Sequence, residues 1–426
     1  MRKILIFNLA AILLISLNGF AQRNPGKLWE DKVFEPQFRS VMAFPAGPLP
    51  QAYLQPSVVG MNEGRPMILT FDELADEFDN YFVALIHCNS DWKESSLYPM
   101  DYIDAYNEFP ILEYNFSRNT LVNYVNYQFQ VPQVKLPGNY ALVVYRNRNQ
   151  NEIVFSKRVM FVSNQVNVGG RVAISAGVEQ RNTHQQVEFT IAYPNLDLNN
   201  PSQEIKVVVR QNQRWDNALV NLKPFRVQEN QRLLDYRNFD LKNNFPGGSE
   251  FRFFDLRTLN FTGQNITNLT KDRNFYIATI GADALRRGQA YSETLDINGN
   301  FIIENNDLPT GQRDPDYVLT EFFLQSGKID GKVKLMGALT NWGGYEEAEM
   351  QYDANANGYR TEIFVKQGWY DYSYSVESKT LPPFHFEGSR FETENLYEII
   401  VYYRPIGARG DQIIGYQKIE ANRRRD

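Results

Sequence analysis

VNYQFQV, residues 125–131, alternates apolar and polar side chains along its whole length. Because successive side chains of a strand point to opposite faces, this stretch predicts a strand with one buried face and one solvated face. The same period of two recurs at residues 189–193 and 370–376. Pairs such as Asn298-Gly299 and Asn357-Gly358 favour tight hairpins, because both residue types tolerate a positive φ angle. The chain is therefore predicted to be all-β.

The spacing of these strands also predicts how the chain is divided. Strands do not alternate with long helical segments, so the pattern favours tandem antiparallel β-sandwich domains of the immunoglobulin-like or early-set type. We expect domains at residues 22–163, 164–313 and 314–426. The first boundary follows an apolar strand, and the second lies in a polar connection that contains the Pro and Gly of residues 308–311.

Residues 70–78 fit two different structures. Thr70 and Glu73 have the spacing of a helix capping box, and Phe71, Leu74 and Phe78 would then share one face. The same residues also fit an extended strand. The sequence leaves both alternatives open.

The first 21 residues have the features of a secretory signal peptide. Basic residues precede an apolar run over residues 4–17 that is too short to span a bilayer comfortably, and Gly-Phe-Ala follows at residues 19–21. We expect cleavage after Ala21 and a mature chain from Gln22. Its net charge becomes −8, because the leader carries two of the positive charges in a formal total of −6. The mature chain is expected in an envelope compartment.

Composition limits the partners and the covalent chemistry. Cys88 is the only cysteine, so the chain has no internal disulfide, and we expect no lipid at the mature N-terminus. No later stretch is apolar enough to predict direct membrane insertion. The acidic balance argues against nucleic acid as a partner, since phosphates need a concentrated basic face. The basic run at residues 423–425 is expected to be a solvated tail.

The sequence contains no recognisable catalytic set. Its three histidines are His87, His184 and His385, and no serine lies in a nucleophile motif. Residues 87–92, HCNSDW, contain possible metal ligands, but their spacing matches no zinc pattern. We interpret them as the end of a buried strand followed by a polar turn, with Trp92 packed. No catalytic, metal-binding or cofactor-binding residue, no cofactor and no small-molecule substrate is therefore predicted, and the protein is expected not to be an enzyme.

Two further motifs are better explained as turns. Residues 353–358, DANANG, match the first half of a calcium loop, but the last ligand position falls on Phe364 instead of a glutamate. A hairpin turn accounts for the same residues. Arg409-Gly410-Asp411 is likewise interpreted as a turn and not as an adhesion signal.

The C-terminal region resembles the early-set immunoglobulin-like modules that accompany starch and glycogen enzymes. The likeness lies in residues 333–337, 340–342 and 368–372. In those modules exposed tryptophans stack on sugar rings, a role that Trp342 and Trp369 would fill here. The alternative, which we favour, is that both tryptophans are structural.

Several segments taken together resemble the plug protein of the Bacteroidetes type IX secretion system, formerly a family of unknown function. They occur in order over nearly the whole mature chain, at residues 71–74, 87–92, 114–120, 138–140, 211–212, 250–255, 296–299 and 366–370. The resemblance implies a periplasmic, non-enzymatic protein that closes the inner mouth of the giant outer-membrane translocon barrel. The expected partner is that barrel, and the sequence does not indicate which residues contact it.

The rival hypothesis is a secreted or surface carbohydrate-binding protein that uses the C-terminal module. A secreted cargo of this system should end in a recognised sorting domain. The last residues, 413–417 and 422–426, do not resemble one.

Overall fold

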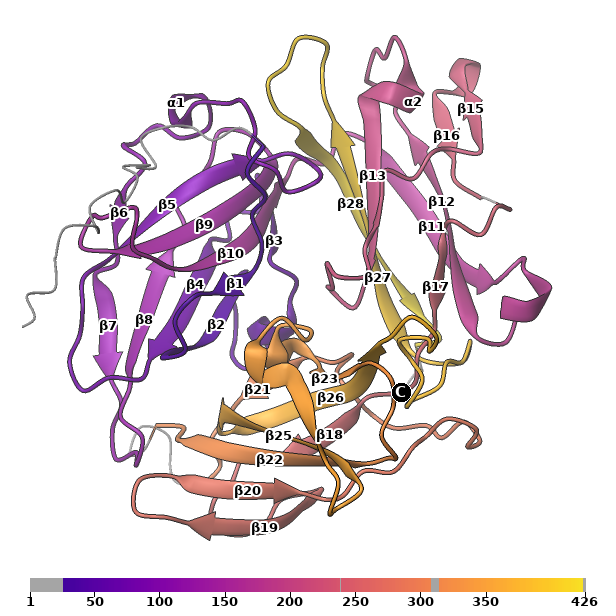
Figure 1. The fold of residues 1–426 in the computed structure, drawn as a ribbon. Coiled ribbons are helices and arrows are strands. Elements are labelled where there is room, and N and C mark those ends of the chain that lie inside the picture. The colour runs from indigo at the N-terminus through magenta and orange to yellow at the C-terminus, as the bar shows by residue number, and fades with distance from the viewer. Residues whose placement is uncertain (1–25, 238, 308–313, 424–426) are drawn as a thin grey trace, which may run out of the picture.

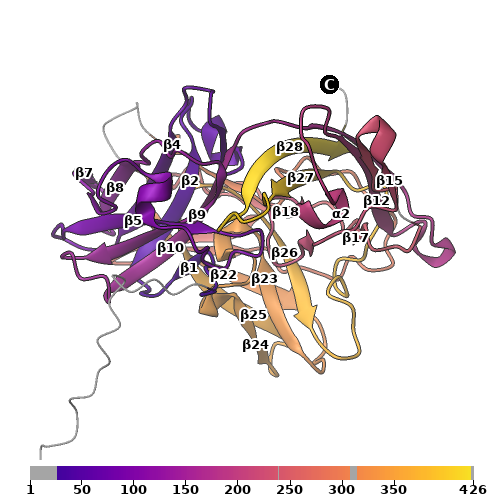
Figure 2. The same cartoon turned by 90° about the horizontal axis from the view of Figure 1, so that it is seen from above.

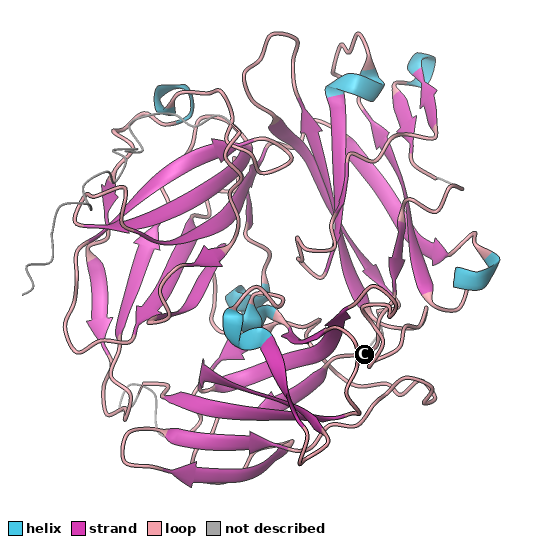
Figure 3. Cartoon of the chain, in the orientation of Figure 1, coloured by secondary structure: helices cyan, strands magenta, loops and turns pink. Residues whose placement is uncertain are grey.

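The computed structural model describes residues 26–237, 239–307 and 314–423. Its strands form three units arranged as a triangle, and each unit touches the other two (Figures 1 and 2). Helix is confined to short turns (Figure 3). The prediction of an all-β protein built from antiparallel sheets is confirmed. The expected signal segment and Gln22 lie outside the described residues.

The first unit, residues 26–163, is a sandwich of two sheets. One has the order β1-β10-β9-β5-β6 with β3 beside β10, and the other has the order β2-β4-β8-β7. The elements are β1 (Lys32–Val33), β2 (Phe38–Pro45), η1 (Gln51–Leu54), β3 (Val58–Gly60), β4 (Met67–Glu73), β5 (Tyr81–Cys88), α1 (Pro99–Tyr102), β6 (Phe109–Pro110), β7 (Glu113–Phe116), β8 (Val125–Gln130), β9 (Gly138–Arg146) and β10 (Ile153–Val162).

The core of the first unit explains two of the sequence patterns. Val125, Tyr127 and Phe129 are buried along β8, as the alternation predicted. The Tyr127 ring stacks on Phe71 at a centroid distance of 4.9 Å. Phe71 belongs to β4, so the helical alternative for residues 70–78 is wrong. All seven residues of β4 are buried, because the strand lies inside its sheet and is covered on both faces.

The second unit consists of residues 164–249 together with 394–423. Its sheets have the orders β11-β12-β16-β15, with β17 beside β12, and β14-β13-β27-β28. The elements are β11 (Asn167–Ile174), η2 (Val178–Gln180), β12 (His184–Ala192), α2 (Pro201–Glu204), β13 (Ile205–Gln211), β14 (Leu219–Val220), β15 (Arg226–Gln228), η3 (Glu229–Gln231), β16 (Leu233–Asp235), β17 (Asn244–Pro246), β27 (Asn395–Tyr403) and β28 (Gln412–Ala421).

The third unit, residues 250–393, is one long sheet whose strands share a single hydrophobic cluster. Its order is β18-β26-β23-β24-β25-β22-β20-β19, with β21 beside β26. The elements are β18 (Arg252–Asp255), β19 (Ile266–Lys271), β20 (Tyr276–Ile280), β21 (Phe301–Ile303), β22 (Tyr317–Gln325), β23 (Lys332–Met336), η4 (Ala338–Thr340), η5 (Glu346–Ala348), β24 (Glu349–Asp353), β25 (Gly358–Lys366) and β26 (Gly368–Glu377).

Strand pairing does not follow the predicted division at residues 313 and 314. β27 and β28 close the sheet of β13, while β21 and β22, on either side of that position, belong to one sheet. A polar connection in sequence marks a loop but carries no information on which strands pair across it. We therefore propose the three units above as the domains. The connection itself, residues 308–311, lies outside the described residues.

No helix in the described ranges is long and apolar enough to cross a membrane.

Candidate functional site

The three units meet around a cavity of about 560 Å³, and side chains from every unit line it. Buried polar contacts hold the units together at their junctions. The cavity and these junctions, where residues distant in sequence meet, form the candidate site.

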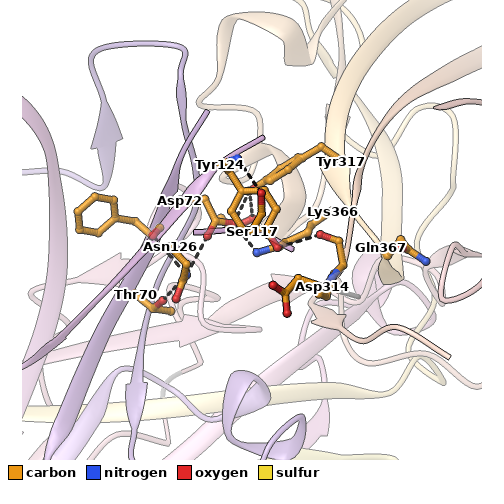
Figure 4. A network of polar contacts seen from close by, with 12 residues as sticks. Thr70, Asp72, Ser117, Tyr124, Asn126, Asp314, Tyr317, Lys366 and Gln367 are labelled. Atoms are coloured by element: carbon orange, nitrogen blue, oxygen red, sulfur yellow. Dashed lines mark hydrogen bonds and ion pairs between the residues drawn. The ribbon is translucent and has the colours of Figure 1, made fainter. Parts of the chain in front are cut away.

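The junction between the first and third units is a buried ion pair (Figure 4). Lys366, at the end of β25, places its Nζ 2.7 Å from Oδ2 of Asp72 in β4. Asp72 is fully buried and Lys366 nearly so. Removing either charge from such a pair leaves the other without a partner where water cannot solvate it, which costs roughly 3–5 kcal/mol.

Neighbouring side chains satisfy the rest of the buried carboxylate. Tyr317 of β22 donates its hydroxyl to Asp72 Oδ2 at 2.6 Å, and Asn126 of β8 donates to Oδ1 at 2.8 Å. The Lys366 ammonium also lies 3.9 Å from the ring centroid of Tyr124. Burial, with the charge of Asp72, raises the pKa of Tyr317 well above its usual value, so this hydroxyl stays a donor.

A second contact fixes the β7–β8 hairpin on the third unit. The backbone N–H groups of Leu121 and Val122 donate to the Asp316 carboxylate at 2.7 and 3.1 Å. Arg118 forms an ion pair with Asp314 at 3.0 Å. The hairpin therefore bridges the first unit to the start of β22.

The junction between the first and second units combines charge with an apolar cluster. Asp411 is fully buried and forms ion pairs with Arg404 at 2.6 Å and Lys206 at 3.1 Å. It also accepts the backbone N–H of Ser90 at 2.9 Å. Burial by itself would raise the pKa of Asp411, but these hydrogen bonds and charges outweigh it and lower the pKa. Asp411 therefore stays ionised and pins the strand end after β5 to the second unit.

The HCNSDW segment lies at this same junction. Cys88 and Trp92 belong to one buried cluster with Val208, Ile400 and other residues of the second unit. Asn89 and Lys93 close the turn through their backbones, as the interpretation of a strand end followed by a turn predicted. Burial raises the pKa of the Cys88 thiol, which keeps it protonated and unreactive at neutral pH.

His87 is buried beside Ser95, whose hydroxyl lies 2.9 Å from its Nδ1. Burial lowers the pKa of His87 to about 4, so the ring is neutral at physiological pH. His184 lies in β12 of the second unit, and His385 lies in the third unit beside Phe386. Among the residues that the structure describes, no three acidic, histidine or cysteine side chains are grouped so that they could hold a metal.

The other motifs occupy structural positions. Residues 353–358 form the hairpin turn between β24 and β25, where Asp353 accepts the backbone N–H groups of Asn355 and Ala356 at 2.9 and 3.1 Å. The turn interpretation of Arg409-Gly410-Asp411 is also supported, since Arg409 forms an ion pair with Asp101 and Asp411 is buried.

The two tryptophans of the C-terminal module have different surroundings. Trp369 stacks on Phe253 with centroids 4.3 Å apart and has the Arg257 guanidinium 5.3 Å from its ring, an arrangement that favours packing. Trp342 lines the central cavity.

An exposed apolar surface lies on the first unit and was not predicted from the sequence. We call it the aromatic edge; it consists of Phe78, Tyr106, Leu112, Tyr114 and Phe116. Tyr106 and Leu112 are 82% and 77% exposed. β7 is the last strand of its sheet, on the outer side of the unit (Figure 1). Single apolar residues on a surface are ordinary. Only the fold shows that four of these lie along β7 and the segment leading to it, and that Phe78, from the connection between β4 and β5, stacks on Tyr114 with ring centroids 4.6 Å apart.

The fold and its junctions define the class: a β-sandwich protein of several units that are joined by a buried ion pair and by buried hydrogen bonds. Residues 45–163 match the family described as "Type 9 secretion system plug protein 1st domain". The resemblance to the plug family is thereby confirmed for this segment, which makes up most of the first unit.

A solved structure supports the arrangement of the whole chain. It is the crystal structure of a hypothetical protein from Parabacteroides merdae ATCC 43184, with a TM-score of 0.86 and 27% identity, and the alignment covers 92% of this chain and 100% of that one. A marsupial T cell receptor also aligns, at 8% identity over 83% of this chain and 95% of that one. Its TM-score of 0.13 is too low to indicate a shared fold. No curated protein matches the sequence.

Proposed function

We propose that this chain is a non-enzymatic periplasmic protein that binds and seals the periplasmic opening of the giant outer-membrane translocon barrel. The observation that supports this function best is that the plug-family domain is fixed to the rest of the chain on two sides, by the buried Asp72–Lys366 ion pair and by the hydrogen bond from Ser90 to the buried Asp411. A seal must keep its shape while it occupies an opening. The first and third units cannot separate without breaking the buried Asp72–Lys366 ion pair, which favours a fixed arrangement.

The proposal includes the route and the compartment. The chain is exported by its signal peptide, is cleaved after Ala21, and acts in the periplasm beside the outer membrane. Sealing depends on shape and contact and needs no cofactor, metal or small-molecule substrate.

We assign the barrel contact to the aromatic edge. All of its residues lie within the segment that matches the plug family. Aromatic side chains are enriched at the centres of protein interfaces, where a few of them contribute most of the binding energy. β7 also has one side on which no described strand pairs, so a barrel rim built of strands would find both apolar side chains and free backbone groups there.

Co-purification from detergent-solubilised envelopes tests the proposal. We expect the tagged wild-type chain to carry a very large outer-membrane barrel protein with it. The triple variant Tyr106→Ala, Leu112→Ala, Phe116→Ala should lose most of that barrel. A matched triple variant, Val178→Ala, Phe261→Ala, Ile406→Ala, changes residues that are equally apolar and exposed on the other two units, and it should retain the barrel.

Two outcomes are informative against the proposal. If the wild-type chain brings down no barrel protein, binding to the translocon is wrong. If both triple variants retain it equally, the aromatic edge is not the contact.

A further inference from the structure

The central cavity is positively charged in an acidic protein. The chain has a formal net charge of −6, yet five basic side chains and only three acidic ones line the cavity. The basic residues are Lys32, Lys157, Arg158, Arg210 and Lys334, and the acidic ones are Glu30, Asp31 and Asp216. A concave site with an excess of one charge attracts ligands of the opposite charge.

Three of the five basic side chains are paired, whereas Lys32 and Arg158 form no ion pair in the described part of the chain. Lys157 pairs with Asp31, Arg210 with Glu398 and Lys334 with Glu377. In the described part of the chain, no carboxylate lies within ion-pair distance of the Arg158 guanidinium. Its Nε and Nη2 donate to the carbonyl oxygen of Trp29 at 2.9 and 2.5 Å, which orients the group without neutralising it. Burial lowers the pKa of Arg158 and outweighs the charges of Asp31 and Glu30, which act to raise it.

A second polar group on the same wall also lacks a partner. The Trp92 side chain is only 3% exposed, and its indole Nε1 has no hydrogen-bond acceptor among the described residues. The Arg158 guanidinium lies 4.8 Å from the Trp92 ring centroid and 5.5 Å from that of Trp215, so the cation and the unpartnered indole N–H belong to one cluster. A half-buried guanidinium beside a buried indole N–H supplies the donors that an oxyanion requires.

The remaining walls offer contacts for the body of a ligand. Trp215 of the second unit and Trp342 of the third unit present aromatic surface, and each has an arginine over its ring, Arg210 and Arg214, at 4.6 Å. Amide and hydroxyl side chains complete the lining and can bond to peptide groups; they are Gln55, Ser57, Gln213, Asn300 and Asn341. A cavity of about 560 Å³ is of the size that encloses a ligand no larger than a short peptide.

We propose that this cavity binds a short acidic peptide segment, with a carboxylate of the peptide placed against Arg158 and the indole N–H of Trp92. Because all three units line the cavity, a bound segment contacts all of them at once and stabilises their arrangement. The inference does not depend on the sealing function, since it rests on the lining residues alone.

Titration with a blocked tetraglutamate peptide tests the proposal on the whole mature chain, by calorimetry and by the fluorescence of the cavity tryptophans. We expect saturable binding with one peptide per chain and a rise in melting temperature. Blocked tetralysine should give neither. Arg158→Gln should weaken tetraglutamate binding roughly tenfold or more, as expected when a charge-assisted hydrogen bond is lost. Arg171→Gln makes the same change at an exposed arginine of β11 and should leave binding unchanged.

Ala338→Trp is an independent variant that keeps Arg158 and fills the cavity with a large side chain from the third unit. It tests whether the peptide binds in the cavity even if Arg158→Gln does not fold. It should abolish binding. The proposal is overturned if the wild-type chain shows no saturable binding, or if folded variants with an altered cavity bind tetraglutamate as tightly as Arg171→Gln does.

Discussion

At the residue scale, the stability of the junction between the first and third units depends on the ion pair of Asp72 and Lys366. Both charges are buried, so each depends on the other and on the donors around it. We predict that Lys366→Met lowers the free energy of unfolding by about 3–5 kcal/mol, because it leaves a buried carboxylate without a counter-charge. Denaturant unfolding measures this directly.

An exposed ion pair in the same unit provides the control. Lys332 pairs with Glu349 at 2.7 Å, but its side chain is 58% exposed. Lys332→Met should change the free energy of unfolding by less than about 1 kcal/mol. In the double variant Asp72→Asn, Lys366→Met, part of the lost stability should return. Equal effects of the two lysine substitutions would contradict the importance given to the buried pair.

His87 predicts a specific pH dependence of stability. Its pKa is lowered to about 4 in the folded chain, mainly by burial, whereas the unfolded chain titrates near the usual 6.5. As pH falls below about 6.5, the unfolded state takes up a proton that the folded state does not. Stability is therefore lost between about pH 6.5 and 4, by up to roughly 1.4 kcal/mol per pH unit.

The measurement compares the free energies of unfolding of the wild-type chain and His87→Gln between pH 6.5 and 4. The contribution of the carboxylates to the pH dependence is common to both chains and cancels in the difference. The wild-type curve should fall more steeply with acidification. Parallel curves would show that His87 does not set this dependence.

Residue identities in turns and strand ends could be predicted from the sequence, because their signals are local. The end of β5 at Cys88 and the turn at residues 353–358 are examples. Asp72 and Lys366 could not be paired in advance, since they lie 294 positions apart and each is an ordinary charged residue in sequence. Both do lie in segments that carry the plug resemblance, residues 71–74 and 366–370. The structure shows why these two segments belong together.

At the scale of elements, alternation identified strands but not their neighbours. β13 pairs over seven residues with β27, which is nearly two hundred residues further along the chain. A period of two shows which face of a strand is buried, but it does not show which strand lies beside it. The division at residue 313 was predicted from loop composition, which is why it differs from the arrangement of the sheets.

Fragments of the second unit test this arrangement. We predict that a fragment of residues 164–313 does not unfold cooperatively, because β13 and its apolar residues have lost β27 and β28. A second fragment contains residues 164–250 and 394–423, with a short Gly-Ser linker between residues 250 and 394. This fragment should fold. The linker is short because the Glu394 backbone N–H donates to the Glu250 carboxylate at 3.3 Å. Thermal unfolding followed by circular dichroism distinguishes the two, and cooperative unfolding of the 164–313 fragment would contradict the proposed units.

At the scale of the whole molecule, three β units held together by buried polar junctions behave as one body. Inter-domain motion is the usual expectation for separate domains, unless the interface between them is large or strongly fixed. Here Asp72 fixes the first unit to the third through Lys366, and Asp411 fixes it to the second by accepting the backbone N–H of Ser90. The proposed contact with the translocon barrel differs from these internal junctions, because a seal that opens must release its partner. We expect that contact to be of standard size, roughly 1,200–2,000 Å² in total, with a polar rim.

The central claim is that this body seals the translocon, and outer-membrane permeability tests it most directly. The measurement is uptake of a large antibiotic by a strain that lacks this protein but keeps an intact translocon, alongside secretion of a cargo protein. We predict increased uptake with secretion retained, restored to normal by the wild-type chain but not by the Tyr106→Ala, Leu112→Ala, Phe116→Ala variant. Unchanged uptake with secretion abolished would contradict the account and indicate a role in assembly or transport instead of sealing.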